Sequence, residues 1–208
     1  MTGRADIGRV SLAILAGGEG ARLGGEKAGL LLGGERLIDR ALRRLAWLSE
    51  DRWVVLRRGQ ALTVQGARLA EDLAPYEGPL AGMAAALKSA HLEWVFVLAC
   101  DMPFVQRPVV EALLALAEGC QAVVPRLRVG LEPLHALYHT SCLGALCRAL
   151  ERGERRLSAF LDDLTVRYLE EETLQGIDAA HRSFFNINTS QDLEQARAFL
   201  QEESIAAR

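Results

Sequence analysis

Short apolar runs alternate along the chain with segments of helical periodicity. The runs that predict buried strands cover residues 10–16, 53–56, 68–71, 94–99, 121–125 and 134–138. Helices are predicted over residues 79–90, 108–117, 142–150, 157–164 and 190–202. Pro79 stands near the first turn of its helix, and Ser190 is the expected N-cap of the last one.

A further helix is predicted from Glu35 onward, where the apolar positions take a helical period. One face of this helix carries Leu37, Ile38, Ala41, Leu42, Leu45 and Leu48, and the other face carries Arg40, Arg43 and Arg44. The pattern indicates an amphipathic helix with its arginines on the side away from its apolar stripe.

Strands that are apolar throughout and alternate with helices predict an α/β fold. We expect a single-domain, doubly wound, mostly parallel sheet with helices on both faces. Ligands of such sheets bind beyond the carboxyl ends of the strands. A glycine-rich turn follows the strand at 10–16, and Asp101 follows the strand at 94–99. Both features are therefore expected at the same edge of the sheet.

The composition is that of an ordinary globular protein, with 50% hydrophobic and 25% charged residues among 208. A net charge of −3 creates no general attraction for nucleic acid or for an anionic membrane, so neither partner is expected. We find no secretory signal and no run that could span a bilayer. The four cysteines show neither CxxC nor zinc spacing, which indicates reduced thiols in a cytoplasmic protein. Cys100 has the alternative interpretation of a catalytic thiol.

The turn "AGGEGARLGGEK" fits neither of two familiar phosphate loops. The spacing of Gly18, Gly20 and Gly24 is one residue too long for G-x-G-x-x-G. The P-loop requires Ser or Thr after its lysine, and Lys27 has neither. One interpretation is a loop with its own cations, Arg22 and Lys27, which could neutralise a triphosphate. The other is a flexible surface turn with solvated charges.

Residues 15–27 match L-A-G-G-x-x-x-R-[ML]-G-x-x-K at every fixed position. This segment resembles the nucleotidyltransferases, and the chain is most similar to the molybdenum cofactor guanylyltransferases. Four further segments carry the same resemblance: "EDLAPYEGPLAG" (71–82), "VLACDMPFV" (97–105), "LEPLHALY" (131–138) and "FFNINTSQDL" (184–193). The chain departs from the family in two places. Leu56 stands where some members have an asparagine, and Glu19-Gly20-Ala21 lacks a common serine.

The resemblance implies a Rossmann-like nucleotidyltransferase domain over residues 1–208, with its nucleotide-binding half at 8–105 and its acceptor-binding half at 106–203. The implied reaction is Mg²⁺-dependent transfer of GMP from GTP to the phosphate of molybdenum-molybdopterin. Proteins that deliver molybdopterin or mature molybdoenzymes are implied partners. The implied catalytic residues are Arg22, Lys27 and Asp101, and Asp101 is also the metal ligand. The implied nucleotide contacts are Leu15, Ala16, Gly17, Gly18, Lys27, Asp72, Gly78, Pro79, Leu80 and Asp101, and the implied acceptor contacts are Asn186 and Asn188.

Each of these assignments has a structural alternative. Asp101 could cap the next turn, Asn186 and Asn188 could form an Asx turn, and residues 78–80 could simply start a helix. Arg155 and Arg156 fit either the pterin phosphate or a solvated helix end. His135 and His139 are spaced too far apart along a strand to share a metal. At the level of function, the alternatives are a cytidylyl- or sugar-nucleotidyltransferase, or a nucleotide-binding module without catalysis.

Overall fold

The computed structural model describes residues 9–20 and 25–206 of the chain, built around one eight-stranded sheet. The strand order is β10-β9-β11-β8-β1-β6-β7, and β12 pairs with β9. These strands are β1 (Val10–Leu15), β6 (Arg52–Leu56), β7 (Arg68–Glu71), β8 (Trp94–Ala99), β9 (Ala122–Leu127), β10 (Gly130–Leu131), β11 (His135–His139) and β12 (Val166–Glu170). Two small hairpins complete the strands: β2 (Glu19–Gly20) with β3 (Gly25–Glu26), and β4 (Leu31–Leu32) with β5 (Glu35–Arg36).

The sheet is mostly parallel, as predicted. β1 pairs in parallel with both β6 and β8, and the pairs β6–β7 and β9–β12 are parallel too. β11 runs antiparallel to β8 and β9, and β10 runs antiparallel to β9. No helix separates β9 from β11 in the chain, and such a short connection can only join antiparallel neighbours.

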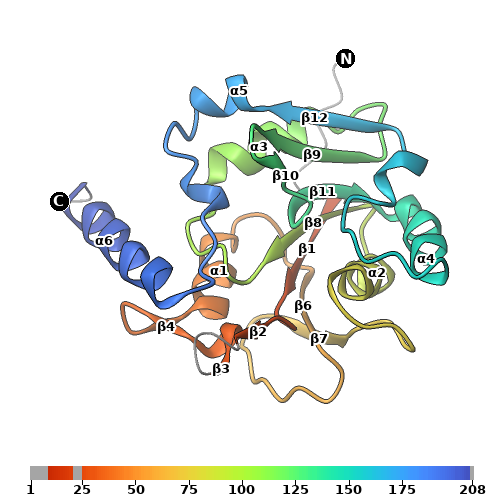
Figure 1. The fold of residues 1–208 in the computed structure, drawn as a ribbon. Helices are drawn as coiled ribbons and strands as arrows, with labels where there is room; N and C mark the ends of the chain where they lie inside the picture. Colours follow the sequence, from red (N-terminus) through yellow and green to blue (C-terminus); the bar gives the residue numbers. More distant parts are fainter. Residues whose placement is uncertain (1–8, 21–24, 207–208) are drawn as a thin grey trace.

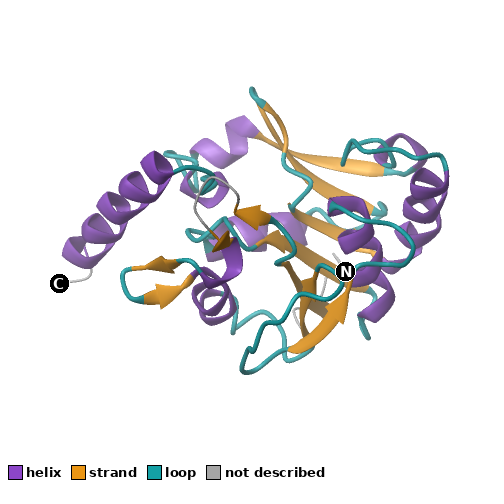
Figure 2. Ribbon diagram, turned by 60° about the horizontal axis from the view of Figure 1, so that its bottom comes forward, coloured by secondary structure: helices purple, strands orange, loops and turns teal. Residues whose placement is uncertain are grey.

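Helices cover both faces of this sheet (Figures 1 and 2). One face packs against α1 (Leu37–Arg44), α3 (Arg107–Ala115) and α5 (Glu171–Gln175). The other face packs against α2 (Pro79–Ser89) and α4 (Leu143–Glu151). Successive residues of β1 enter the two cores alternately, with Leu12 and Ile14 on one side and Ala13 on the other. Burial on both faces explains why the central strands β1 and β8 are almost entirely apolar.

The last helix, α6 (Ser190–Ala206), extends away from the sheet (Figures 1 and 2). Its apolar residues join a third, smaller core with Leu32, Leu37, Phe104 and Ile187. Short 3₁₀ turns complete the fold: η2 (Lys27–Gly29), η3 (Thr140–Cys142), η4 (Leu161–Asp163) and η5 (Arg182–Phe184). No helix among the described residues has the length and apolar character that crossing a membrane requires.

Several local predictions are wrong. Residues 157–164 are turns that end in η4, not a helix, although Phe160 and Leu161 are buried as a helical stripe would be. The sequence reasoning missed β12 and α5, because β12 buries only Leu169 and so lacks a continuous apolar run. The strand that begins near Gln121 does not stop at Pro125 but continues to Leu127.

The N-cap of α6 is Thr189 rather than Ser190. Thr189 Oγ1 accepts a hydrogen bond from the Asp192 N–H at 3.2 Å, and an Asp192 carboxylate oxygen accepts one from the Thr189 N–H at 2.8 Å. These two bonds make a reciprocal capping box one residue earlier than expected.

Arg40 departs from the expectation for the charged face of α1, because it is 4% exposed. The structure covers that part of the face with α6 and with the loop that follows β8, so Arg40 is enclosed rather than solvated.

Candidate active site

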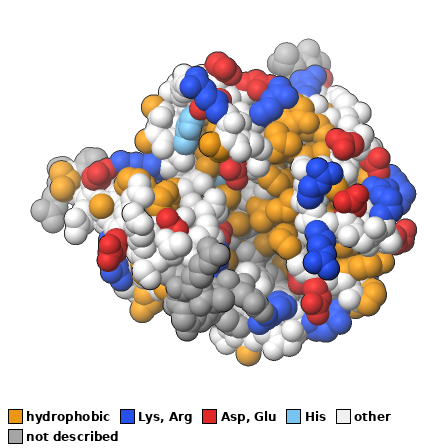
Figure 3. Space-filling view, viewed as in Figure 1, with side chains coloured by type: hydrophobic (Ala, Val, Ile, Leu, Met, Phe, Trp, Pro, Cys, Tyr) orange, Lys and Arg blue, Asp and Glu red, His pale blue; other side chains and the backbone are white. Residues whose placement is uncertain are grey.

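A cleft of about 1310 Å³ opens at the carboxyl ends of the parallel strands. Its lining comes from the segments after β1, β6, β7 and β8, from the start of α2, and from residues 131–134, 154–158 and 186. In the space-filling view, apolar side chains gather in a hollow on this face, with Lys or Arg side chains beside it (Figure 3). Drug-sized ligands usually occupy about 300–1,000 Å³, so this cleft has room for two substrates.

The turn after β1 forms one end of the cleft, with Leu15, Gly17 and Gly18 in its lining. A β-carbon on Gly17 would lie 2.9 Å from the Arg57 backbone nitrogen, so only glycine permits this approach of the two segments. Ala16 is buried outside the lining, its N–H bonded to the Val55 oxygen and its carbonyl to Gln60 Nε2. Ala16 is thus the one expected nucleotide contact among the described residues that does not line the cleft, and its contact stays a prediction. Arg22 lies outside the described residues.

Lys27, Asp101 and Asn188 converge beside this turn, and we call these three residues the cleft cluster. Lys27 Nζ lies 2.6 Å from Asp101 Oδ2 and 2.5 Å from Asn188 Oδ1. The Lys27 and Asp101 side chains are each 13% exposed. The three residues are far apart in the chain, Lys27 being 74 positions from Asp101 and 161 from Asn188. The parallel strand order and the docking of α6 bring them together.

One carboxylate oxygen of Asp101 has no partner among the described residues. Its Oδ1 is buried and, within the described structure, accepts no hydrogen bond. Its backbone oxygen accepts the Ile187 N–H at 3.0 Å, which joins Asp101 directly to the segment between Asn186 and Asn188. A buried carboxylate oxygen without a partner is costly, so this atom is placed to receive a cation or a donor.

The wall of the cleft near the start of α2 carries Asp72, Gly78, Pro79 and Leu80. The pKa of the Asp72 carboxyl is raised to about 6, mainly by burial; the nearby Arg58 and Arg57 lower it, and the carboxylates of Glu77 and Glu71 raise it. Gly78 precedes α2 with φ of 88°, a conformation that strongly favours glycine. This wall therefore offers one carboxylate beside a helix start.

Of the two expected acceptor contacts, Asn186 lines the cleft and Asn188 does not. Asn186 Nδ2 donates to the Phe184 oxygen at 3.0 Å. Asn188 accepts a hydrogen bond from Lys27, which does line the cleft. Arg155 and Arg156, whose placement the sequence left open, both line the cleft. They are therefore available to an anionic substrate.

Sequence reasoning missed Glu132 and Arg57 as cleft residues. Burial, with Asp101 nearby, raises the pKa of Glu132 to about 7. A signal for Glu132 existed, since it stands inside the quoted segment "LEPLHALY", but nothing in its periodicity separates a cleft carboxylate from a surface one.

The remaining chemical groups fit structural roles. Burial raises the pKa of Cys100 to about 12, which keeps its thiol protonated and removes the basis for a catalytic thiolate. All four cysteines are free. His135 is fully buried between Phe96 and Phe184, and burial lowers its pKa to about 3. No group of three or more His, Cys, Asp or Glu among the described residues could hold a metal without further ligands.

The fold and the cleft define a Rossmann-like nucleotidyltransferase. The family model for the MobA-like NTP transferase domain matches residues 12–168, and the chain belongs to this family. The molybdenum cofactor guanylyltransferase of Desulfosudis oleivorans is 37% identical over 187 residues, covering 89% of this chain and 93% of that protein. Its counterpart in a strain of Pseudomonas putida is 38% identical over 190 residues, covering 88% and 95%.

Solved structures agree with this assignment. The molybdopterin-guanine dinucleotide biosynthesis protein A of Archaeoglobus fulgidus superposes with a TM-score of 0.80 at 34% identity, covering 92% of this chain and 99% of that one. The 2-C-methyl-D-erythritol 4-phosphate cytidylyltransferase of Thermus thermophilus has a TM-score of 0.70 at 24% identity, covering 93% and 99%. The second likeness shows the fold alone.

Proposed function

We propose that this protein transfers GMP from GTP to the phosphate of molybdenum-molybdopterin, giving the guanine dinucleotide cofactor and pyrophosphate. The observation that carries the proposal is the cleft cluster, in which Lys27, Asp101 and Asn188 meet within hydrogen-bonding distance in a cleft large enough for two substrates. The names of the relatives support the choice of GTP and of a molybdopterin acceptor.

The reaction asks the protein for positioning and charge neutralisation. The acceptor is a phosphate monoester with a second pKa near 6, so it is largely a dianion at neutral pH. One of its oxygens attacks the α-phosphorus of GTP, a new P–O bond forms, and the bond to the β-phosphate breaks as pyrophosphate leaves. No general base and no covalent nucleophile is needed. Two polyanions must instead be brought in line.

Mg²⁺ fits the residues that are present. Asp101 Oδ1 is a hard oxygen ligand without a partner in the described structure. The Asn188 amide oxygen accepts a hydrogen bond from the Lys27 ammonium, which also pairs with Asp101 Oδ2. Mg²⁺ typically takes one or two carboxylates and completes its shell with phosphate oxygens and water. Asp101 would hold the ion, which would neutralise charge on the phosphates. Lys27 would then be released from Asp101 to bind the phosphates as a mobile cation.

The two substrates are assigned to separate parts of the cleft lining. Asp72 supports guanine, because a carboxylate can accept the two donors on the guanine edge, whereas cytosine offers one amino donor there. Gly17 and Gly18 let backbone approach the nucleotide closely. Arg155, Arg156 and Asn186 also line the cleft and are assigned to the acceptor. We also assign the protein to the cytoplasm, with partner proteins that deliver molybdopterin and receive the dinucleotide.

Thermal denaturation with each of the four nucleoside triphosphates, with and without Mg²⁺, tests the nucleotide assignment. We expect stabilisation by GTP that Mg²⁺ enhances, followed by pyrophosphate release when molybdenum-molybdopterin is added. Preferred stabilisation by CTP would favour a cytidylyltransferase. Binding of GTP without any pyrophosphate release would favour a binding module without catalysis.

A further inference from the structure

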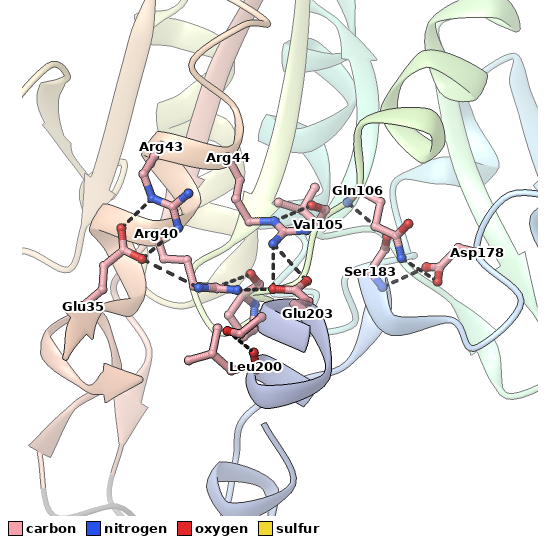
Figure 4. Close-up of polar contacts among 12 residues, drawn as sticks. Glu35, Arg40, Arg43, Arg44, Val105, Gln106, Asp178, Ser183, Leu200 and Glu203 are labelled. Carbon is pink, nitrogen blue, oxygen red and sulfur yellow. Dashed lines mark hydrogen bonds and ion pairs between the residues drawn. The ribbon is translucent and has the colours of Figure 1, made fainter. Parts of the chain in front are cut away.

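A second set of charges lies outside the cleft lining, where α6 meets α1 (Figure 4). Arg40 and Arg44 stand one helical turn apart on α1, and both reach Glu203 near the end of α6. Arg40 Nη2 donates to Glu203 Oε2 at 2.7 Å, and Arg44 Nη1 donates to Glu203 Oε1 at 3.1 Å. We call Arg40, Arg44 and Glu203 the anchor cluster.

The same two arginines also hold the loop that carries Asp101. Arg40 Nε donates to the Pro103 oxygen at 3.0 Å, and Arg44 Nε donates to the Val105 oxygen at 2.9 Å. Pro103 and Val105 closely follow Asp101 on the segment after β8. Two arginines of one helix therefore bind backbone carbonyls on alternate residues of one loop.

The anchor cluster reaches the segment of Lys27 as well. Arg40 Nη1 lies 3.7 Å from Glu35, on the hairpin that follows Lys27. Leu30, the residue before that hairpin, donates its N–H to the Lys27 oxygen at 3.1 Å and so closes the turn that carries Lys27. Arg40 thus contacts the loop that follows Asp101, the helix that follows Asn188 and the hairpin that follows Lys27.

Aromatic contacts follow the same route. Phe104, between the two carbonyls that accept from the arginines, packs edge-on against Phe185 and Phe199. Phe185 precedes Asn186, and Phe199 belongs to α6. The Arg40 guanidinium lies 5.3 Å from the centre of the Phe104 ring. Loop and helix are therefore packed together as one unit, and the arginines hold that unit against α1.

Enclosing an ion pair costs free energy, and apolar residues in place of both partners are often as stable or more so. Placing Arg40 at 4% exposure is therefore poorly explained by stability alone. The burial of Arg40 is explained if its planar guanidinium serves to hold two segments in one fixed geometry.

Given the function proposed above, we propose that Arg40, Arg44 and Glu203 are positioning residues. They set the docking of α6 against the loop after β8, and thereby hold Asn186 and Asn188 opposite Lys27 and Asp101 for the acceptor. None of the three lines the cleft, and they act through Ile187, whose N–H bonds to the Asp101 oxygen.

The test is Glu203→Gln, compared with Glu194→Gln, which removes one charge from an exposed site on the same helix. In Glu203→Gln we expect the Ile187 amide to exchange its hydrogen about tenfold faster than in the wild type. The Cys100 amide, bonded to the Leu15 oxygen in the sheet, should keep its wild-type exchange rate. The control should leave both amides unchanged.

Kinetics separates positioning from general stability. For Glu203→Gln we expect kcat of nucleotidyl transfer to fall about tenfold while the Kd for GTP stays within about twofold. Arg44→Lys, which keeps the charge but cannot reach both Val105 and Glu203, should show the same pattern more weakly, and it serves if Glu203→Gln does not fold.

Two results would overturn the proposal: Ile187 exchange and turnover equal to those of Glu194→Gln, or a parallel loss of GTP affinity and turnover. The exchange measurement needs no substrate. If the wild type failed to transfer GMP, the proposed function would be refuted. The exchange rates of Ile187 would still show whether the anchor cluster positions that segment.

Discussion

The cleft cluster and the anchor cluster are built alike and differ in how completely their polar atoms are paired. In both, a lysine or arginine from the N-terminal part of the chain meets a carboxylate from a distant segment. In the anchor cluster both Glu203 oxygens and the Nε atoms of both arginines are bonded. In the cleft cluster Asp101 Oδ1 is buried and unpaired within the described residues.

The difference shows how one kind of interaction serves two purposes. A fully paired set has nothing to gain from a new ligand, and breaking it leaves buried charge behind. A set with one oxygen unpaired gains when a cation or donor arrives, so its partners are ready to exchange. We therefore expect substitutions in the cleft cluster to lower turnover strongly with little loss of stability. Substitutions in the anchor cluster should lower stability and, by disturbing alignment, reduce turnover less.

Asp101→Asn should have the largest effect. Loss of the carboxylate removes the ligand proposed for Mg²⁺, and we expect Mg²⁺-dependent pyrophosphate release to slow by about 10³-fold. The Tm should stay within about 3 °C of the wild type, because Asp101 contributes little to the core. Undiminished turnover would remove Asp101 from the mechanism.

Lys27→Met should follow, with kcat/KM for GTP lowered by about 10²-fold through loss of the cation at the phosphates. Without the ammonium between Asp101 and Asn188, Mn²⁺ should bind the nucleotide-free variant more tightly than the wild type, measured by the free-ion electron paramagnetic resonance signal. Lys88→Met, an exposed change on α2 and the other lysine of the chain, is the control. If Lys27→Met mainly unfolded the protein, the cleft cluster would be a structural ion pair like the anchor cluster.

Arg40→Met tests the anchor side of the comparison. We expect the free energy of unfolding in urea to fall by about 2 kcal/mol, because Glu203 and the Pro103 carbonyl lose a buried donor. Arg43→Met, whose side chain is 59% exposed, should change it by no more than about 0.5 kcal/mol. Equal effects of the two substitutions would show that burial of Arg40 has no special consequence.

Asp72→Asn should have the smallest effect, a rise of Tm that depends on pH. The folded pKa of about 6 is above the usual value near 3.8, so the buried charge destabilises the fold wherever it is ionised. That destabilisation is complete above pH 6 and disappears below about pH 4, where both states are protonated. The Tm difference between variant and wild type should fade over this range, whereas Glu118→Gln, an exposed control, should show little difference at any pH.

The sequence predicted most of the sheet and its relation to the cleft. Periodicity located β1, β6 and β8 to within one residue at each end, because buried parallel strands are largely apolar. It failed at β12 and at residues 157–164. An edge strand that buries one residue has no apolar run, and a series of turns can bury the same residues as a helix.

The placement of Lys27 and Asp101 in one cleft was predictable, since the glycine turn and the strand end are local patterns at one sheet edge. Their roles remain predictions for the experiments above to decide. Glu132 could not be identified, because its altered pKa arises from burial in a cleft built by other segments.

Local periodicity was sufficient to predict an α/β fold with the glycine turn and Asp101 at one sheet edge, because apolar runs are encoded over a few residues. The nucleotidyltransferase class came from the resemblance of short motifs to that family. The partner of the polar face of α1 was not encoded in this way. A helical period reports which side of a helix is apolar, and says nothing of which distant segment covers the other side. Only folding brings Glu203 onto Arg40 and Asn188 onto Lys27, across 163 and 161 residues of chain.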